Sequence, residues 1–340
     1  MTNPVLVEVT RGPRVESRHR GAIAIVDAGG RTLLALGAVD APVFPRSAVK
    51  IFQALPLVES GAADAAGLTE AELALACSSH NGEAVHVDGA RAILAKAGAT
   101  EAALECGPQW PALGPDQDIL RRTGTPPCAV HNNCSGKHAG FVCTVAHMGH
   151  SVEGYVKEDH PLQVLIHDIL TEITGASLEA DVCGIDGCSI PTWAVPVENL
   201  AAAFAKVASG SGVSQERGAA LTRLRKACCA HPVEVAGTDR FCTDVMARFS
   251  DAAYVKTGAE GVYCAAIPAS GLGVAIKIDD GGTRGSEAVM AAVLQALVAR
   301  TDDDRGFLDR WANQPVETRR GYVAGTIRAS KDLTDALAAL

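Results

Sequence analysis

The stretch "GAIAIVDAGGRTLLALG" (Gly21–Gly37) carries the clearest strand signal near the start of the chain. Two apolar runs flank Asp27-Ala28-Gly29-Gly30, residue types that suit a tight turn, so the stretch predicts a β-hairpin. Near the other end of the chain, "AAYVKTGAEGVYCAAIP" (Ala252–Pro268) and "GLGVAIKIDDG" (Gly271–Gly281) predict adjacent antiparallel strands with glycine-containing turns.

The apolar residues between these strands recur with helical spacing. Thr69 followed by Glu72 has the form of a capping box, which marks the start of a helix. Helices are expected at about 47–57, 69–77, 83–97, 136–148, 160–175, 197–209, 215–230 and 286–300.

Strands at both ends with helices between them predict an α+β fold, in which an antiparallel sheet pairs the N- and C-terminal segments. We expect residues 1–340 to form a single catalytic unit. Residues 1–50 and 250–330 would mainly build its sheet-containing part, and residues 51–249 a mainly helical lobe.

The composition excludes several classes of protein. With 48% hydrophobic and 20% charged residues, the 340-residue chain is typical of a compact globular protein. The net charge is -9 and no block of basic residues occurs, so neither a nucleic-acid partner nor a membrane surface is expected. Eleven cysteines at irregular spacing argue against a disulfide framework. Without the apolar core of a secretory signal or an 18-residue apolar run, a cytoplasmic location is expected.

A serine and a lysine stand out in the apolar stretch "FPRSAVKIFQALPLVES" (Phe44–Ser60). On a helix, Ser47 and Lys50 would share a face, because positions i and i+3 are neighbours. A neutral lysine amine within reach takes the proton of a serine that attacks a carbonyl, and apolar surroundings favour that neutral form. The alternative is a partly exposed helix lysine, since a Ser-x-x-Lys pair is expected by chance about once in such a chain.

Two further elements strengthen the catalytic interpretation. "CSSHNGE" contains Ser79-His80-Asn81, and "AYVKTGAEG" contains Lys256-Thr257-Gly258 on an expected strand. Ser-x-x-Lys, Ser-x-Asn and Lys-Thr-Gly in this order are typical of serine β-lactamases and penicillin-binding proteins. Ser79 would relay protons to the leaving group and Lys256 would set the electrostatics of its hydroxyl. The alternatives are a turn-stabilising hydroxyl for Ser79 and a solvated edge-strand lysine for Lys256.

Two loops concentrate thiols and other polar groups, "HNNCSGKHAGF" (His131–Phe141) and "CGIDGCSIP" (Cys183–Pro191). Thiolates of Cys134 and Cys188 would suit a soft metal such as zinc, together with a third protein ligand and water. Neither loop offers Cys-x-x-Cys, however, so spacing alone favours buried free cysteines.

The polar side chains of these segments suit a small zwitterionic ligand, which needs an acidic group for its amine and a basic group for its carboxylate. Asp186 and Arg46 are the candidates for these two tasks. The loop around Lys137 is not a phosphate loop, because it lacks the glycine spacing of that motif.

Several segments together resemble the rhizobial-type (Rhizobium etli type) L-asparaginases over about residues 5–330. The segments are "RSAVKIFQALP", "CSSHNGE", "HNNCSGKHAG", "IDGCSIP", "HPVEVAGTDRFCTDVM" and "VKTGAEGVY". The resemblance implies hydrolysis of L-asparagine to L-aspartate and ammonia by a homodimer with a β-lactamase/transpeptidase-like fold. One departure is Ile51, where the family tends to have proline.

The resemblance also implies roles for individual residues. Ser47 with Lys50, and Ser79 with Lys256, would form two catalytic Ser–Lys pairs. One zinc ion per chain would lie near the substrate. Its protein ligands would be Cys134, Lys137 and Cys188. The residues lining the substrate pocket would be Arg46, His80, His138, Asp186 and Cys242.

Two other functions remain possible from the sequence. One is a β-lactamase-like serine hydrolase, esterase or D-Ala peptidase, against which the missing export signal counts. The other is a metal- or amino-acid-binding sensor with an inactive site. The presence of all four catalytic candidates argues against an inactive site: Ser47, Lys50, Ser79 and Lys256.

Overall fold

The computed structural model describes residues 2–340, which divide into two compact units. The first unit combines residues 2–48, Val195–Ser209 and Val255–Leu340. The second combines Val49–Ala194 and Gly210–Tyr254. The first contains the large sheet and the second is mostly helical, so the chain is an α+β protein.

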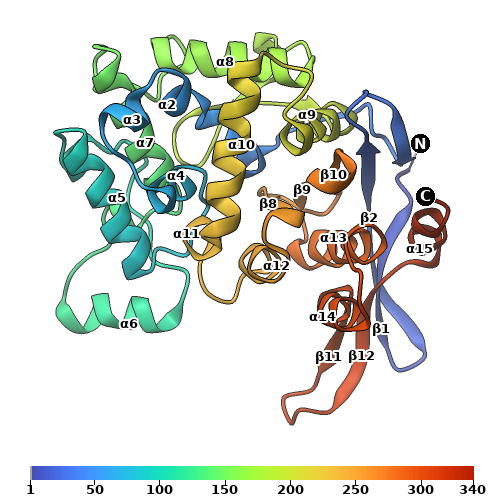
Figure 1. The fold of residues 1–340 in the computed structure, drawn as a ribbon. Helices are drawn as coiled ribbons and strands as arrows, with labels where there is room; N and C mark the ends of the chain where they lie inside the picture. Colours follow the sequence, from blue (N-terminus) through green and yellow to red (C-terminus); the bar gives the residue numbers. More distant parts are fainter. Residues whose placement is uncertain (1) are drawn as a thin grey trace. The chain divides into compact units, whose positions relative to one another are not determined.

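An eight-stranded sheet forms the framework of the first unit (Figure 1). Its strands follow the order β11-β12-β1-β2-β10-β9-β8, with β3 paired to β2, and β4 and β7 form a separate small pair. The strands are β1 (Val5–Arg11), β2 (Arg14–Val26), β3 (Thr32–Leu36), β4 (Pro42–Val43), β7 (Val195–Pro196), β8 (Tyr254–Thr257), β9 (Val262–Ile267), β10 (Leu272–Ile278), β11 (Asn313–Glu317) and β12 (Val323–Ala329). The helices are α9 (Val197–Ser209), α13 (Thr283–Leu297), α14 (Asp302–Ala312) and α15 (Lys331–Ala338).

The pairing of the two ends of the chain is confirmed. The expected hairpin is β2–β3, in which Ile23 faces Leu36. Strand β2 also pairs antiparallel with β10, and Val26 faces Gly273. On the other side of β2, β1 joins the C-terminal strand β12. Segments more than 240 residues apart in the sequence therefore share one sheet.

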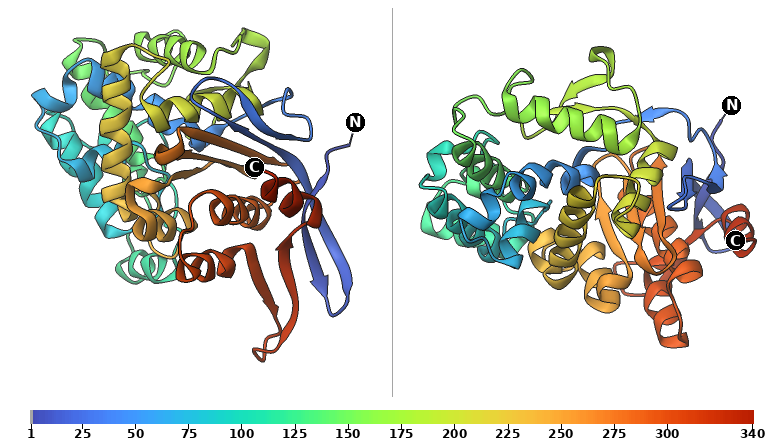
Figure 2. Two further views of the ribbon diagram at one scale, coloured as in Figure 1. Left: turned by 45° about the vertical axis from the view of Figure 1, so that its right-hand side comes forward. Right: turned by 45° about the horizontal axis from the view of Figure 1, so that its top comes forward.

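Every residue of β9 is buried, so both faces of this central strand are covered. Figures 1 and 2 show α9 and α13 on opposite sides of β9 and β10. The helix α9, expected in the helical part, belongs to the sheet-containing unit. A Cβ at Gly273 would lie only 2.0 Å from Ala201 O and 2.2 Å from Ala205 N. Glycine on β10 thus permits the α9 backbone to pack directly on the sheet.

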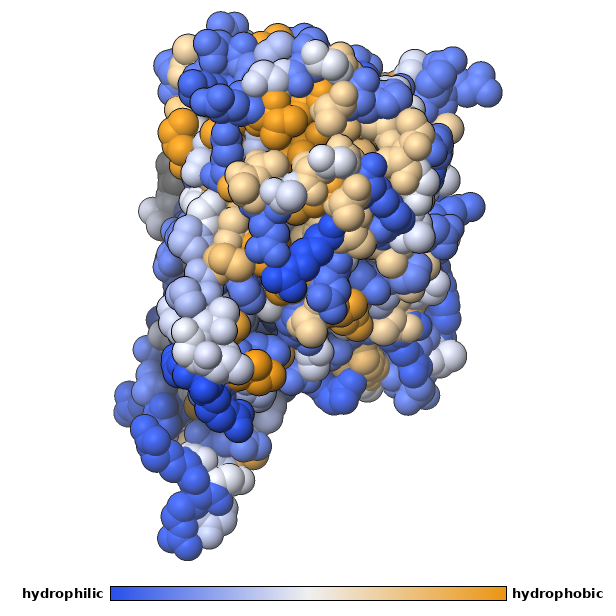
Figure 3. Space-filling view, turned by 90° about the vertical axis from the view of Figure 1, so that its left-hand side faces the viewer, coloured by the Kyte–Doolittle hydropathy of each residue, from blue (hydrophilic) through white to orange (hydrophobic). Residues whose placement is uncertain are grey.

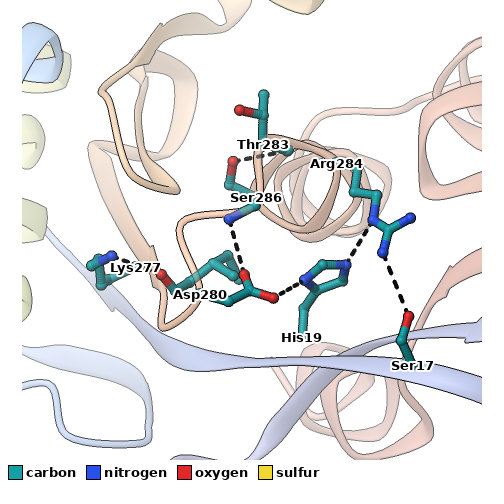
Figure 4. A network of polar contacts seen from close by, with 9 residues as sticks. Ser17, His19, Lys277, Asp280, Thr283, Arg284 and Ser286 are labelled. Atoms are coloured by element: carbon teal, nitrogen blue, oxygen red, sulfur yellow. Dashed lines mark hydrogen bonds and ion pairs between the residues drawn. The ribbon is translucent and has the colours of Figure 1, made fainter.

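A polar network anchors β2 to the turn between β10 and α13 (Figure 4). The ring of His19 lies 2.7 Å from Asp280 Oδ2 through Nδ1. Arg284 Nε donates to His19 Nε2 at 2.9 Å, so the ring proton lies on Nδ1 and is donated to the carboxylate. Burial opposes ionisation of Asp280, but the Gly282 N–H and His19 lower its pKa overall.

The second unit is built mainly from helices. Its helices are α1 (Lys50–Gln53), α2 (Leu55–Glu59), α3 (Ala62–Ala65), α4 (Glu70–Ala76), α5 (Ala84–Lys96), α6 (Gly114–Thr123), α7 (Ser135–His147), α8 (Pro161–Thr174), α10 (Gln215–Ala230), α11 (Pro232–Ala236) and α12 (Phe241–Phe249), and its strands are β5 (Cys183–Ile185) and β6 (Pro191–Trp193). The expected helices at 69–77, 83–97, 136–148, 160–175 and 215–230 are confirmed as α4, α5, α7, α8 and α10. The Thr69–Glu72 capping box is present.

The expected continuous helix over 47–57 is wrong in detail. A 3-10 turn over Arg46–Val49 precedes α1, and α2 follows after Ala54. Two residues explain the interruptions. Arg46 has a left-handed φ of 51°, and Pro56 has no N–H for the helical hydrogen-bond ladder.

One face of the molecule shows how hydrophilic and hydrophobic residues are distributed on the surface. The face drawn in Figure 3 shows hydrophobic patches interrupted by hydrophilic residues. Among residues 2–340, none of the helices combines the length and the hydrophobicity that crossing a bilayer requires.

The close approach at Gly273 predicts the effect of a single methyl group. We expect Gly273→Ala to lower the free energy of unfolding by about 1–3 kcal/mol, because the Cβ meets backbone atoms that cannot turn away. Denaturant unfolding measures the change. Gly306→Ala is the control: it lies within α14 with open space around its Cβ, and should raise stability by about 0.5–1 kcal/mol. Equal effects of the two substitutions would contradict this account.

Candidate active site

The turn that carries Ser47 is tightly held within the first unit. Ala48 N donates to Pro45 O at 3.0 Å, and Arg46 occupies the left-handed region. A Cβ at Gly258 would lie 2.5 Å from Pro45 O, so the glycine after Lys256-Thr257 lets the end of β8 approach this turn. Strained backbone of this kind is typical of functional sites. Ser47 itself is half-buried.

Lys256 lies on β8, as the Lys-Thr-Gly element predicts. Its side chain is only 1% exposed, and Nζ donates to Thr257 O at 3.2 Å. The alternative of a solvated edge-strand lysine is therefore wrong.

Lys50, the first residue of α1, is buried in the second unit and is 1% exposed. Its Nζ donates to Ser78 O and to Cys134 Sγ, the latter at 3.1 Å. The alternative of a partly exposed lysine is wrong. The expectation of purely apolar surroundings is also wrong, because a carbonyl and a sulfur from distant segments contact the amine.

Lys50 belongs to a buried group that we call the amine–thiol cluster: Lys50, Cys134, Lys137 and Cys188. Lys137 Nζ donates to Cys188 Sγ at 3.0 Å. A hydrogen bond from Cys188, assisted by the charges of Lys50 and Lys137, lowers the pKa of Cys134 well below its usual value despite burial. The same bond, together with burial, raises the pKa of Cys188. The Cys188 thiol and the two amines thus favour the ionised form of Cys134.

Local hydrogen bonds fix the backbone around Cys134 and Cys188. Cys134 caps α7, and its N–H donates to Asn132 Oδ1 at 2.9 Å. Cys188 lies in the turn between β5 and β6, which the Asp186 N–H closes on Ile190 O at 2.8 Å. Burial opposes the charge of Lys137, but Cys188 and Cys134 raise its pKa, and Asp186 adds to this effect.

Two members of the cluster, Cys134 and Cys188, are of a type that binds zinc. Two contacting sulfurs and an amine converge, and the bridging thiol proton is one that a metal displaces. Among the described residues, no group of three or more His, Cys, Asp or Glu side chains is arranged to hold a metal. A zinc site here would consequently need the amine of Lys137 as a third ligand.

Ser79 and His80 lie in the loop after α4, in the second unit. Ser79 N donates to Val235 O at 2.9 Å, and Asn133 Nδ2 lies 3.3 Å from Ser79 Oγ. Gly82 N donates to His80 Nδ1, so Nε2 carries the ring proton and donates to Ser135 Oγ at 3.0 Å. The loop and the start of α7 are thereby joined.

His138 and Cys242 are both buried in the second unit. Burial, reinforced by Lys137 and Lys50, lowers the pKa of His138 well below its usual range, which keeps the ring neutral. Its Nδ1 lies 2.7 Å from the Tyr155 hydroxyl. Cys242 lies on α12.

The structure brings together Lys50, the Ser79 loop and the other three members of the amine–thiol cluster. Arg46, Ser47 and Lys256 belong to the first unit, and the other predicted site residues belong to the second. Sequence reasoning missed Asn133 and Tyr155. Asn133 lies in the quoted "HNNCSGKHAGF" stretch, but nothing local indicated Tyr155, because its contact with His138 is tertiary.

Comparisons with known proteins give one strong result. The model of the family described as L-asparaginase II matches residues 7–329. No curated protein matches the chain.

Two solved structures of a protein called Mglu, one native in 4.3 M NaCl and one in a tris and glutamate form, are weakly similar. Both have a TM-score of 0.35, with 15% and 14% identity over 78% and 84% of this chain. The match spans only 57% and 61% of the length of Mglu. A likeness this weak carries no argument about fold or function.

The cluster predicts an asymmetry between two buried cysteines of the second unit. In metal-free protein, Cys188→Ala should cost about 3 kcal/mol of unfolding free energy, because it leaves the buried Lys137 amine without its sulfur partner. Cys143→Ala on α7 is the control and should cost about 1 kcal/mol. Adding Lys137→Met to Cys188→Ala should restore part of the loss. Equal costs for the two cysteines, with no recovery in the double variant, would rule out the inferred contact.

Proposed function

The chain belongs to the L-asparaginase II family, and on that premise we propose that it hydrolyses L-asparagine to L-aspartate and ammonia. The match of the family model over residues 7–329 carries the proposal. The buried group formed by Cys134, Lys137 and Cys188 supports it, because groups with perturbed pKa values gather where chemistry is performed.

We propose Ser47 as the nucleophile and Lys50 as its base. Ser47 Oγ attacks the side-chain amide carbon of asparagine, and the hydroxyl proton passes to Lys50. The tetrahedral intermediate collapses, the amide nitrogen leaves as ammonia with that proton, and an aspartyl ester remains on Ser47. Water then cleaves the ester and returns the serine proton. Strain at Arg46 and burial of Lys50 support this assignment.

Lys50 must be a neutral amine to accept a proton. The contacts of its Nζ with Ser78 O and, at 3.1 Å, with Cys134 Sγ hold the amine in one place. The neutral form of Lys50 is part of this proposal, and the Lys50→Met variant tests it.

Ser79 and Lys256 would form the second Ser–Lys pair and assist departure of ammonia. The Asn133 contact fixes the Ser79 hydroxyl, and the burial of Lys256 excludes a purely solvated role. The ammonium and the carboxylate of the substrate would be recognised by the predicted pocket residues. These are Arg46, His80, His138, Asp186 and Cys242.

A zinc ion would be held by Cys134, Lys137 and Cys188. It would supply a Lewis acid that orients a ligand oxygen or amine beside the catalytic groups. Further proposals from the family resemblance are a β-lactamase/transpeptidase-like arrangement, a single catalytic unit, a homodimer and a cytoplasmic location.

The catalytic assignment predicts large losses of activity from two small changes. Ser47→Ala and Lys50→Met should each lower kcat/KM for asparagine by about three orders of magnitude, because nucleophile and base act as a unit. Ammonia release measures the rate. The controls are Ser270→Ala, at an exposed position, and Lys331→Met, whose side chain is 82% exposed; both should keep the activity. Full activity of Ser47→Ala would remove the nucleophile assignment, and turnover of nitrocefin without ammonia release would favour a β-lactamase-like hydrolase.

The donor set predicts a metal content that can be counted directly. Untagged protein purified without chelator should contain about one zinc per chain by elemental analysis, because two cysteine sulfurs in contact are ligands that zinc prefers. Cys134→Ser should lose most of the metal, whereas Cys264→Ser, a buried cysteine of β9, should keep it. Metal-free wild-type protein from such a preparation would support the interpretation as buried free thiols.

A further inference from the structure

We propose that Tyr155 is a positioning residue that fixes the tautomer of His138, so that His138 Nε2 presents an N–H donor to a substrate oxygen. The substrate part of this inference rests on the proposed asparagine hydrolysis. The tautomer part depends only on the contacts of two buried side chains.

The hydrogen bonds around the Tyr155 hydroxyl determine where its proton goes. Glu105 N lies 2.9 Å from the Tyr155 oxygen and can only donate to it. Among the described residues, the acceptor within reach of the tyrosine proton is His138 Nδ1 at 2.7 Å, and donation to this nitrogen leaves the buried hydroxyl proton paired. Because Nδ1 accepts, the proton of the neutral ring lies on Nε2.

The second observation is that His138 Nε2 is buried without a hydrogen-bond partner among the described residues. The residue as a whole is 0% exposed. Buried donors are nearly always paired in folded proteins, so an unpaired N–H inside a polar site indicates a position for a ligand acceptor.

The surroundings of His138 indicate the chemistry of that acceptor. His138 follows Cys134 by four residues on α7 and therefore lies on the same face of the helix. The positive charges of Lys137 and Lys50 act on the ring. A donor next to two amines suits an oxygen with negative charge, such as a carboxylate of aspartate or the polarised amide oxygen of asparagine.

Tyr155 is held rigidly enough to perform this task. It is 0% exposed, and Gln163 Nε2 donates to its backbone carbonyl at 2.9 Å. The rings of Phe141 and His138 pack edge-on or tilted against it, with centroids 6.2 and 5.4 Å away. The hydroxyl therefore reaches Nδ1 from a fixed direction.

The test combines a spectroscopic and a kinetic readout on the full chain with Tyr155→Phe. In ¹⁵N-histidine-labelled wild-type protein, the His138 signal, assigned by its loss in His138→Gln, should show an unprotonated Nδ1 and a protonated Nε2. In Tyr155→Phe the ring should shift toward the other tautomer. The variant should also bind L-aspartate, measured by calorimetry, and hydrolyse asparagine about tenfold less well.

Tyr263→Phe provides the matched control, because it removes the same hydroxyl from a fully buried tyrosine on β9. It should leave the His138 spectrum, aspartate affinity and kcat/KM unchanged. Thermal unfolding of both variants separates a loss of fold from a loss of positioning.

An unchanged His138 tautomer in folded Tyr155→Phe would overturn the positioning role. A changed tautomer with unchanged aspartate affinity and kcat/KM would overturn the role of the N–H in ligand binding. Failure of wild-type protein to release ammonia would count against the proposed function, while the spectroscopic result would still decide the role of Tyr155.

Discussion

Two lysine amines, Lys50 and Lys137, are removed from water inside the same helical unit, and this burial constrains the rest of the site. A buried ammonium without compensation is costly, so each amine needs a partner. Here the partners are sulfur atoms, since Lys50 contacts Cys134 and Lys137 contacts Cys188. Both buried amines are therefore compensated by contacts inside this unit.

The fold holds the sulfur atoms of Cys134 and Cys188 next to regular elements. Cys134 caps α7 and Cys188 lies between β5 and β6, so neither position depends on a long flexible loop. Hydrogen bonds from Asn133 link the Ser79 loop to the same helix end. In the first unit, glycine at 258 allows β8 to approach the strained turn before Ser47. Each unit thus holds its own functional groups rigidly.

Local patterns were sufficient to predict most elements and the candidate residues. The two apolar runs of Gly21–Gly37, the Thr69–Glu72 capping box and the alanine-rich helices each depend on nearby residues, and all are present as structural elements. The sequence did not predict β11 and β12 as individual strands. The strand β12 is specified by its pairing with β1, some 320 residues away in the sequence. The partners of Lys50 were missed for the same reason. Spacing reveals the helix face on which a lysine lies, whereas the sulfur that it contacts comes from tertiary packing.

We propose that Ser47, three residues before the buried Lys50 in the sequence, forms an acyl-enzyme with asparagine. Rapid acid quenching followed by intact-mass analysis and peptide mapping tests it most directly. The account predicts one aspartyl adduct per chain on Ser47, formed together with one equivalent of ammonia and lost on further hydrolysis. Ammonia released at full rate while neither Ser47 nor Ser79 carries an adduct at any time would contradict it.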